Sequence, residues 1–471
     1  MVKSSDSIIP SCVSVMPMKN KILIANRGEI AVRIIRAAKE LGIETVAVYS
    51  TADETSLHVK LADEAICIGS ERSKDSYLNM NSVLSAAIST GCNAIHPGYG
   101  FLSENSDFVE MVERCNITFI GPNSKTIQMI GDKASAREIA KNNGVPIVEG
   151  SDGIIESVQE GLKIAKKIGY PVMIKASSGG GGRGIAIVRS DDEFTSAFER
   201  TSMEAESSFG DKSLYIEKFI ESPRHIEIQI IGDTKGNIVH LFERDCSMQR
   251  RNQKMIEETP SPILSEMLRR KIGAAALKLA KAINYVNAGT MEFLVDSKGN
   301  FYFIEMNTRI QVEHPITEAI TGIDLVKEQI RVAYGKELSF KQRDVQIHGH
   351  AIECRINAEN AMQGFIPSAG KITNVVFPGG IGVRMDTHIY PGYVVPPFYD
   401  SMLAKLIVHA PTRREAIKKM RVALEQFVIE GISTNIDYQY LIMHNPDFIK
   451  GQYDTGFIAR FNMLVEAKNR E

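Results

Sequence analysis

The chain lacks a charge excess of either sign and any long hydrophobic run. Its 471 residues include 55 Lys and Arg and 57 Asp and Glu, which gives a formal net charge of −2. This balance excludes a general electrostatic attraction to nucleic acid or to an anionic membrane surface. No apolar run approaches the ~18 residues that a membrane-spanning helix needs. We therefore expect a globular protein with no nucleic-acid partner and no membrane partner.

Disulfide signatures are also missing. The six cysteines are scattered and form no Cys-x-x-Cys pair, which favours free thiols in a reducing compartment. The first 17 residues are rich in serine, contain Pro10 and Pro17, and carry Lys3 as their only basic residue. They lack both the apolar core of a secretion signal and the arginines of a transit peptide. We therefore expect residues 1–18 to be a disordered extension and the protein to be cytoplasmic.

The length predicts two to four domains, and residues 21–122 have the pattern of the first. A helix is predicted from about Glu29 to Leu41, and short apolar segments alternate with helical stretches, as in a parallel sheet wrapped by helices. The first turn, Asn26–Glu29, lacks the Gly-x-Gly-x-x-Gly sequence of a dinucleotide site. A ligand here is expected to meet Arg27 or the glycine-rich turn His96–Gly100. The apolar segments are 22–25, 45–49, 65–68, 94–96 and 118–120.

After residue 130 the sequence mixes helices with strands and becomes mainly strands toward its end. The strand-rich part covers residues 350–408, and an amphipathic helix is predicted at 412–426. Further helices are predicted at 131–143, 155–168, 191–207 and 265–283, and strands at 171–175, 185–188, 213–217, 226–231, 238–243, 291–295 and 301–306.

Two acidic strands flank the turn-rich sequence Asp296–Asn300 and indicate a β-hairpin. If the turn centres between Lys298 and Gly299, Glu292 and Glu305 face each other, and Asn307 lies on the same face. Two carboxylates about 5 Å apart repel by about 3 kcal/mol at an effective dielectric near 20, so a cation is expected between them. Oxygen ligands of this kind suit Mg²⁺ or Mn²⁺, which commonly accompany nucleotide phosphates. An acidic strand face without a ligand is the alternative.

The segment Ser177–Gly184 contains four consecutive glycines between two strands. A Walker P-loop runs from a strand into a helix and contains Gly-Lys-Ser/Thr, so it is excluded. The loop's N–H groups can fold around phosphate oxygens, with a plain linker as the alternative. Lys175, inside an apolar strand, predicts an anionic ligand because an unpaired buried lysine is costly. Lys133 and Glu217–Ile220 are spaced to converge on the same cleft, and the basic cluster Gln249–Lys254 fits a small anion better than nucleic acid.

Six motifs, together with Lys175 and its glycine loop, resemble those of the biotin carboxylases of the ATP-grasp superfamily. The similarity extends from about Lys19 to Phe461, and other ATP-grasp ligases do not share the Arg-x-Gln-Val-Glu-His run. The motifs are Ile24-Ala-Asn-Arg-Gly-Glu-Ile30, His96-Pro-Gly-Tyr-Gly-Phe-Leu-Ser-Glu-Asn105, Met129-Ile-Gly-Asp-Lys133, Arg244-Asp-Cys-Ser-Met-Gln-Arg-Arg251, Phe303-Ile-Glu-Met-Asn-Thr-Arg-Ile-Gln-Val-Glu-His-Pro315 and Glu353-Cys-Arg-Ile-Asn-Ala-Glu359.

The resemblance implies a fold that combines α/β and α+β parts. An N-terminal doubly wound parallel sheet is expected at 19–128 and an ATP-grasp domain at 129–340, with a mobile lid at about 146–221. A mainly antiparallel β domain is expected at 341–462, followed by a tail at 463–471.

The resemblance also implies a reaction in which bicarbonate, ATP and biotin give N1-carboxybiotin, ADP and phosphate. Bicarbonate would attack the γ-phosphorus to form carboxyphosphate, which breaks into CO₂ and phosphate. The phosphate would take the N1 proton of biotin, and the ureido group would capture CO₂. Phosphoryl transfer of this kind depends on positioning and charge neutralisation. The implied cofactors are ATP and two Mg²⁺ or Mn²⁺ ions, with biotin as a substrate carried by another chain.

Roles carry over to this sequence position by position. Glu313 would be the base that deprotonates bicarbonate, and Arg309, Arg355 and Lys254 would complete the catalytic group. Bicarbonate would lie against Lys254, Arg309, Gln311 and Val312, biotin against Arg355, Tyr99 and Gly100, and the metal ions against Glu292, Glu305 and Asn307. ATP would contact Lys133, Lys175, Gly181, Gly182, Glu217, Lys218, Phe219, Ile220, His225, Gln249, Asn252, Leu294, Glu292 and Glu305.

Partners follow from the same resemblance. The chain has no Ala-Met-Lys-Met biotin-attachment sequence, so we expect it to act beside a biotin carboxyl carrier protein and carboxyltransferase subunits in a multi-subunit acyl-CoA or pyruvate carboxylase. A homodimer is implied by matches at Arg33, Arg36, Glu40 and Arg384, whereas Ile381 stands where the family often has an aromatic residue. Asn252 stands where a histidine is frequent.

Alternatives remain for individual residues and for the whole chain. Glu313 could pair with Arg309 four residues away, Arg355 could be a surface ion-pair partner, and Lys218 could be a solvated lysine. The chain could instead be a bicarbonate-activating ligase of the carbamoyl-phosphate synthetase type, or a nucleotide-binding regulator without catalysis.

Overall fold

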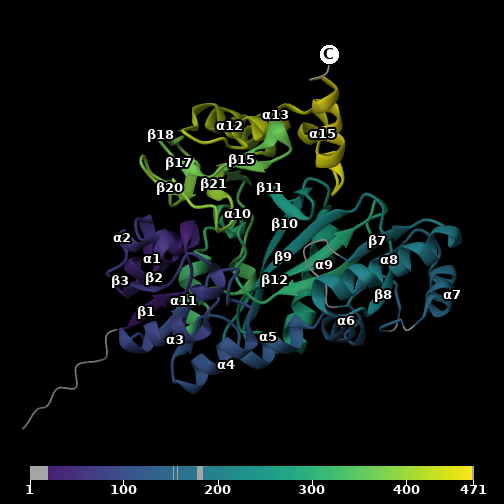
Figure 1. The fold of residues 1–471 in the computed structure, drawn as a ribbon, viewed down its shortest axis with the longest axis horizontal. Coiled ribbons are helices and arrows are strands. Elements are labelled where there is room, and N and C mark those ends of the chain that lie inside the picture. Colours follow the sequence, from purple (N-terminus) through teal and green to yellow (C-terminus); the bar gives the residue numbers. More distant parts are fainter. Residues whose placement is uncertain (1–19, 152, 156, 178–183, 469–471) are drawn as a thin grey trace, which may run out of the picture.

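The computed structural model describes residues 20–151, 153–155, 157–177 and 184–468. The predicted extension at 1–18 and two predicted ATP contacts, Gly181 and Gly182, lie outside these residues. In Figure 1 the N-terminal unit (purple) is on the left, the region containing the predicted lid is on the right, and the C-terminal elements (yellow-green) are at the top. A broad sheet lies between them. Within the described part of the chain, no helix has the length and apolar character required to cross a membrane.

The N-terminal unit is a parallel sheet with strand order β3-β2-β1-β4-β5, which confirms the predicted architecture. Its central strand is buried on both faces, because Ile22 and Ile24 pack beside Ile34 of α1 while Leu23 packs beside Phe108 of α4 on the other side. Such strands are apolar without alternation. The elements are β1 (Lys21–Ile24), α1 (Gly28–Glu40), β2 (Glu44–Ser50), α2 (Leu57–Leu61), β3 (Glu64–Gly69), α3 (Met80–Ser89), β4 (Ala94–His96), α4 (Ser106–Arg114), β5 (Thr118–Phe119) and α5 (Ser124–Gly131).

The region of the predicted lid contains a three-stranded antiparallel sheet, ordered β7-β6-β8, with its own apolar core. Helix α7 begins after Ser157, whose hydroxyl oxygen accepts a hydrogen bond from the N–H of Glu160, a common N-cap. Helix α8 begins after Ser190 and ends at Gly210, which has a left-handed backbone. The elements are α6 (Lys133–Asn142), α7 (Val158–Ile168), β6 (Val172–Ala176), β7 (Ile185–Val188), α8 (Asp191–Phe209) and β8 (Leu214–Lys218).

The largest sheet has eight strands in the order β13-β12-β9-β10-β11-β14-β21-β19. It crosses position 340, because β11 pairs with β14, so one sheet joins the ATP-grasp part to the C-terminal part. Strand β11 falls where the sequence predicts only a basic cluster. The strands are β9 (Arg224–Gly232), β10 (Ile238–Arg250), β11 (Gln253–Thr259), β12 (Asn287–Val295), β13 (Phe301–Asn307), β14 (His350–Asn357), β19 (Val383–Thr387) and β21 (Met402–Ala410).

Helices cover this sheet in two groups. Residues of α6 and α9 pack on β9, β12 and β13, and residues of α12, α13 and α15 pack on β11, β14 and β21. The first group places Lys133 near the paired glutamates, and the second anchors the strands that carry Arg355. The helices are α9 (Glu266–Ala282), α10 (His314–Thr321), α11 (Leu325–Ala333), α12 (Arg413–Gln426), α13 (Ile436–His444), α14 (Pro446–Lys450) and α15 (Phe457–Lys468), and the remaining short strands are β15 (Glu359–Asn360), β16 (Ile366–Pro367), β17 (Gly370–Lys371), β18 (Asn374–Val376), β20 (Val394–Val395) and β22 (Val428–Glu430).

Candidate active site

A cleft of about 1540 Å³ lies where the N-terminal unit, the lid region and both halves of the large sheet meet. Of the predicted site residues that the structure describes, all but Glu313 line the cleft wall. Glu313 is buried behind two of them, Lys254 and Arg355. The predicted residues on the wall are Tyr99, Gly100, Lys133, Lys175, Glu217, Lys218, Phe219, Ile220, His225, Gln249, Asn252, Lys254, Glu292, Leu294, Glu305, Asn307, Arg309, Gln311, Val312 and Arg355.

A row of acidic residues crosses the large sheet at the floor of the cleft. Glu305 of β13 stands opposite Glu292 of β12, which confirms the predicted pair. The predicted turn centre is wrong, because Val295 pairs with Phe301 beside the turn, and a register shift that leaves Ile304 as the extra residue produces the glutamate pair. Glu292 in turn stands opposite Glu227 of β9. Burial and the negative charge of Glu292 raise the pKa of Glu305, so these carboxylates are in electrostatic conflict as expected. The sequence reasoning missed Glu227, although its position two residues after His225 would have placed both on one strand face.

Lys254 supplies the positive charge on this floor. Its Nζ donates to Glu227 at 2.6 Å, Glu292 at 3.1 Å and Glu313 at 2.7 Å. Burial alone would lower the pKa of Lys254, but the three carboxylates outweigh it and raise that pKa well above its usual value. An ammonium bonded to three carboxylates is a buried charge with its partners in place.

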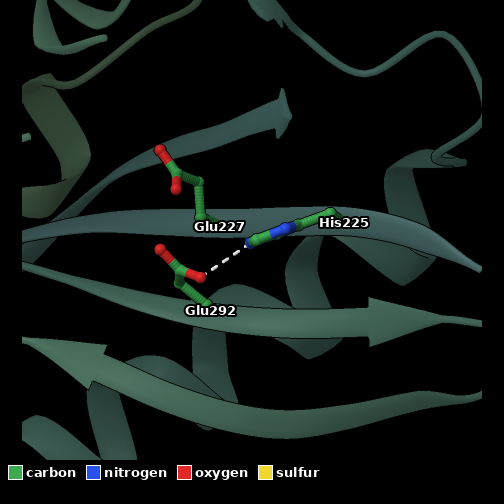
Figure 2. Close-up of side chains that lie close together, drawn as sticks. All are labelled: His225, Glu227 and Glu292. Atoms are coloured by element: carbon green, nitrogen blue, oxygen red, sulfur yellow. Dashed lines mark ion pairs between the residues drawn. The ribbon is translucent and has the colours of Figure 1, made fainter. Parts of the chain in front are cut away.

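His225 lies at the edge of the same group, as Figure 2 shows, with its ring directed at Glu292. The His225 Nε2 to Glu292 Oε2 distance is 2.8 Å. His225, Glu227 and Glu292 offer three ligand atoms close enough together for a metal ion. However, the ammonium of Lys254 already bonds to both of these glutamates, so a cation is present there without a metal.

The predicted metal ligands differ in how they are held. Glu292 Oε1 accepts hydrogen bonds from Asn307 Nδ2 at 2.9 Å and Gln311 Nε2 at 3.1 Å. The oxygen of Asn307 instead accepts from Arg309 at 3.1 Å. Lys133 Nζ lies 3.7 Å from Glu305. The oxygens of Glu292 and Glu305 therefore fit a hard divalent cation, whereas Asn307 would first have to turn its amide oxygen toward it.

Glu313 is fully buried between two cationic side chains. Its Oε1 accepts from Lys254, and its Oε2 accepts from Arg355 at 2.9 Å. Burial favours the neutral acid, but Lys254 and then Arg355 outweigh it and hold the pKa of Glu313 well below its usual range. The alternative pairing with Arg309 is wrong, because Arg309 donates to Glu104 at 2.8 Å. Glu313 is therefore an ionised carboxylate next to the cleft.

Arg355 is held between two buried carboxylates. Its Nε donates to Glu257 at 2.6 Å, and the Nη2 that donates to Glu313 also lies 2.6 Å from Glu257, so the alternative of a surface ion pair is wrong. Lys254 and Glu257 are three residues apart on β11, and a regular strand would direct them to opposite faces. A register shift that leaves Met255 as the extra residue brings them to the same side, as β-bulges near active sites do.

The other end of the cleft carries the predicted nucleotide contacts. Lys175 and Arg137 both form ion pairs with the carboxylate of Glu217, so the anion expected for Lys175 is a glutamate in this structure. Lys218 is not a solvated lysine, because its Nζ donates to the carbonyl oxygens of Gly169 at 2.8 Å and Tyr170 at 2.9 Å. The contacts of Lys218 lie within the lid region, next to the part of the cleft wall that Glu217 and Lys218 form.

The predicted contacts from the N-terminal unit and from Val312 are tied together by Lys405. This fully buried lysine donates to the carbonyl oxygen of Val312 at 2.9 Å and lies 3.1 Å from Glu29 Oε2. Glu29 also accepts a hydrogen bond from the hydroxyl of Tyr99. The network joins three parts of the chain. Sequence reasoning missed Lys405, although it lies inside an apolar strand as Lys175 does and the same argument would have predicted a partner for it.

Family models match three consecutive parts of the chain. The biotin carboxylase N-terminal domain matches residues 18–127, the ATP-binding domain of the carbamoyl-phosphate synthase L chain matches 132–341, and the biotin carboxylase C-terminal domain matches 353–460.

Curated proteins and solved structures agree with these matches. Biotin carboxylase 1 of Bacillus subtilis is 56% identical over 448 residues, covering 95% of this chain and 100% of the relative. The 2-oxoglutarate carboxylase small subunit of Hydrogenobacter thermophilus is 52% identical over 441 residues, covering 94% and 93%. The crystal structure of a Campylobacter jejuni biotin carboxylase–β-γ-ATP complex superposes with a TM-score of 0.91 at 50% identity, covering 94% of this chain and 98% of that one.

The fold and the site define an ATP-grasp ligase. With both flanking domains matched and identities above one half over nearly the whole chain, the protein belongs to the biotin carboxylase family.

Proposed function

We propose that this protein carboxylates biotin at N1 on a separate carrier protein, using ATP and bicarbonate through carboxyphosphate. One observation carries the proposal: the ionised Glu313 is held between Lys254 and Arg355, directly beside a cleft that also contains Lys133 and Lys175. Two cations on the cavity wall thus have a candidate base directly behind them, and two lysines that suit phosphate line the same cavity. This arrangement suits the transfer of a phosphoryl group to an acid that must first lose its proton.

Bicarbonate would lie against Lys254, Arg309, Gln311 and the backbone of Val312, all of which line the cleft. In that position Glu313 would accept its proton, and Lys254 would stabilise the negative charge that develops on the attacking oxygen. Arg309 is held by Glu104, which fixes its guanidinium at the cleft wall. These contacts position the nucleophile before the reaction and require no reorganisation during it.

The triphosphate would lie at the other end, with Lys133 and Lys175 on its phosphates and Glu217–Ile220, His225, Gln249, Asn252 and Leu294 around the nucleoside. Glu292 and Glu305, with Asn307 once its oxygen is turned, would hold divalent cations. Bound Mg²⁺ or Mn²⁺ would supply charge neutralisation for the phosphates. The raised pKa of Glu305, caused by burial and by Glu292, supports this because a bound cation removes the repulsion.

Biotin would enter beside Arg355, Tyr99 and Gly100. The guanidinium of Arg355 would stabilise the negative ureido oxygen after N1 loses its proton to phosphate. Because the hydroxyl of Tyr99 already donates to Glu29, Tyr99 would contact biotin through its ring or backbone.

The partners belong to the same proposal: a biotin carboxyl carrier protein and carboxyltransferase subunits, with this chain as the biotin carboxylase subunit of an acyl-CoA or pyruvate carboxylase. The name of the 2-oxoglutarate carboxylase relative and a solved structure titled as the biotin carboxylase subunit of pyruvate carboxylase support the subunit role. A structure titled as a biotin carboxylase domain dimer supports a homodimer. Ile381, which is 96% exposed, is the position to substitute in a test of dimer formation. The five cysteines in the described residues are free, which supports a cytoplasmic location.

The test is ADP release by the purified chain with MgATP and bicarbonate, with and without free biotin, together with detection of ¹⁴C-carboxybiotin. We expect bicarbonate-dependent ADP release that rises when biotin is added. Release that depends on ammonia and ignores biotin would instead favour carbamoyl-phosphate synthesis, which the match of residues 132–341 makes the relevant rival.

A further inference from the structure

Two buried carboxylates near Arg355 have no part in the proposed reaction. Glu257 of β11 and Glu353 of β14 stand directly opposite each other in an antiparallel pair. Side chains at opposed positions lie on the same face of the sheet with their Cβ atoms about 5 Å apart. Both residues are 0% exposed. The pair therefore places two acids side by side in the interior, on the two strands that also carry Lys254 and Arg355 of the cleft wall.

Their hydrogen bonds are unequal. Glu257 accepts from Arg355 Nε through Oε1, while its Oε2 has no partner among the described residues. Neither oxygen of Glu353 has a hydrogen-bond partner in that same part of the chain. An ionised carboxylate without hydrogen bonds is very costly to bury, so such a group takes up a proton instead.

The charges that face the pair do not remove this conflict. Arg355, Lys254 and Lys405 act on it, but Glu313 adds a further negative charge. Arg355 is shared with Glu313, Lys254 with three other carboxylates, and Lys405 with Glu29. Burial and then the charges of neighbouring carboxylates raise the pKa of Glu353 well above its usual value, and burial raises that of Glu257 to about 7.

We propose that Glu257 and Glu353 form a carboxyl–carboxylate pair that shares one proton, and that Glu257 acts as a positioning residue by holding Arg355 through Nε. Glu353 carries the proton, and its hydroxyl faces the unpartnered oxygen of Glu257. The other oxygen of Glu257 contacts both Nε and Nη2 of the guanidinium and so holds Nη2 beside Glu313. This deepens the proposed role of Arg355 at the biotin end of the cleft and rests on that role.

A double-mutant cycle tests the positioning. Glu257→Ala is expected to lower biotin carboxylation by roughly 10- to 100-fold, the range of a lost hydrogen bond to a charged group. Glu257→Gln restores part of that loss, because the amide oxygen still accepts from Arg355 Nε. In an Arg355→Ala background, Glu257→Ala has no further effect, since Glu257 acts through Arg355. Additive losses in the double variant would refute the positioning role.

Glu353→Gln tests the shared proton without relying on catalysis. An amide has the shape and neutrality of a protonated carboxyl group. The rate of biotin carboxylation should therefore stay within about threefold of the unmodified protein, and the melting temperature within about 2 °C. The infrared carbonyl band of a protonated carboxyl group should weaken in this variant. An unchanged band, or a loss of activity above tenfold, would show that Glu353 is ionised.

The matched control is Glu258→Gln on the same strand. Glu258 is also buried and bonded to an arginine, Arg413, but it stands with His350 and Tyr453, away from the cleft. The Glu258→Gln substitution should lower thermal stability. The ratio of biotin carboxylation to biotin-independent ATP cleavage should stay unchanged. An equal change of that ratio in Glu257→Ala and Glu258→Gln would reduce Glu257 to a structural role. If Arg355→Ala alone leaves that ratio unchanged, the proposed role of Arg355 fails, while the infrared result still decides the shared proton.

Discussion

Glu313→Gln is the sharpest perturbation of the candidate base. The carboxylate accepts from Lys254 at 2.7 Å through one oxygen and from Arg355 at 2.9 Å through the other. A glutamine keeps the size of the side chain, but its NH₂ group must face one of two donors, and it cannot take up a proton from bicarbonate. Losing a positioned general base costs roughly 10²- to 10⁴-fold in rate, which corresponds to about 3–5 kcal/mol of transition-state stabilisation.

Nucleotide binding should survive this change. Lys175 is held by Glu217 at the far end of the cleft, whereas Glu313 bonds to Lys254 and Arg355, so the dissociation constant of MgADP should stay within about threefold. The assay pairs bicarbonate-dependent ADP release with calorimetric titration of MgADP. Glu258→Gln serves as the control for general damage. Turnover above about one tenth of the unmodified rate, with nucleotide binding intact, would remove Glu313 from the role of base.

Three further outcomes are expected. Arg355→Ala should reduce biotin carboxylation at least tenfold more than biotin-independent ATP cleavage, and equal losses in the two assays would contradict its role at biotin. Glu292→Gln should raise the Mg²⁺ concentration needed for half-maximal ADP release by roughly tenfold or more, because one ligand charge is lost; an unchanged Mg²⁺ dependence would place the metal elsewhere. Burial lowers the pKa of His58 from 6.5 to about 4, so the unfolded chain binds more protons below pH 6.5 and stability falls on acidification. Between pH 7.5 and 5 this histidine should cost about 2 kcal/mol, and denaturant melts of His58→Gln should show a shallower fall over that range.

Local chemistry was enough to predict the acidic hairpin. The turn residues at 296–300 indicate the hairpin, and the period of two residues along a strand places Glu305 and Asn307 on one face. The turn alone would pair Glu292 with Ile304, however, and a bulge at Ile304 brings Glu292 opposite Glu305. The same reasoning found the parallel N-terminal sheet, because its strands are short and apolar. It failed at β11, where Lys254 and Glu257 belong to a strand that the polar sequence around residues 249–254 concealed.

The sequence by itself therefore determined the acidic hairpin, the types of ligand atoms and, through its motifs, the family. Only the tertiary structure decided which charges meet, since ion pairs join residues that lie far apart in the chain. Glu313 meets Lys254 and Arg355 rather than Arg309 four residues away. The reason is physical: periodicity sets the direction of a side chain within its own strand, whereas its partners depend on which strands become neighbours and where a bulge shifts their register.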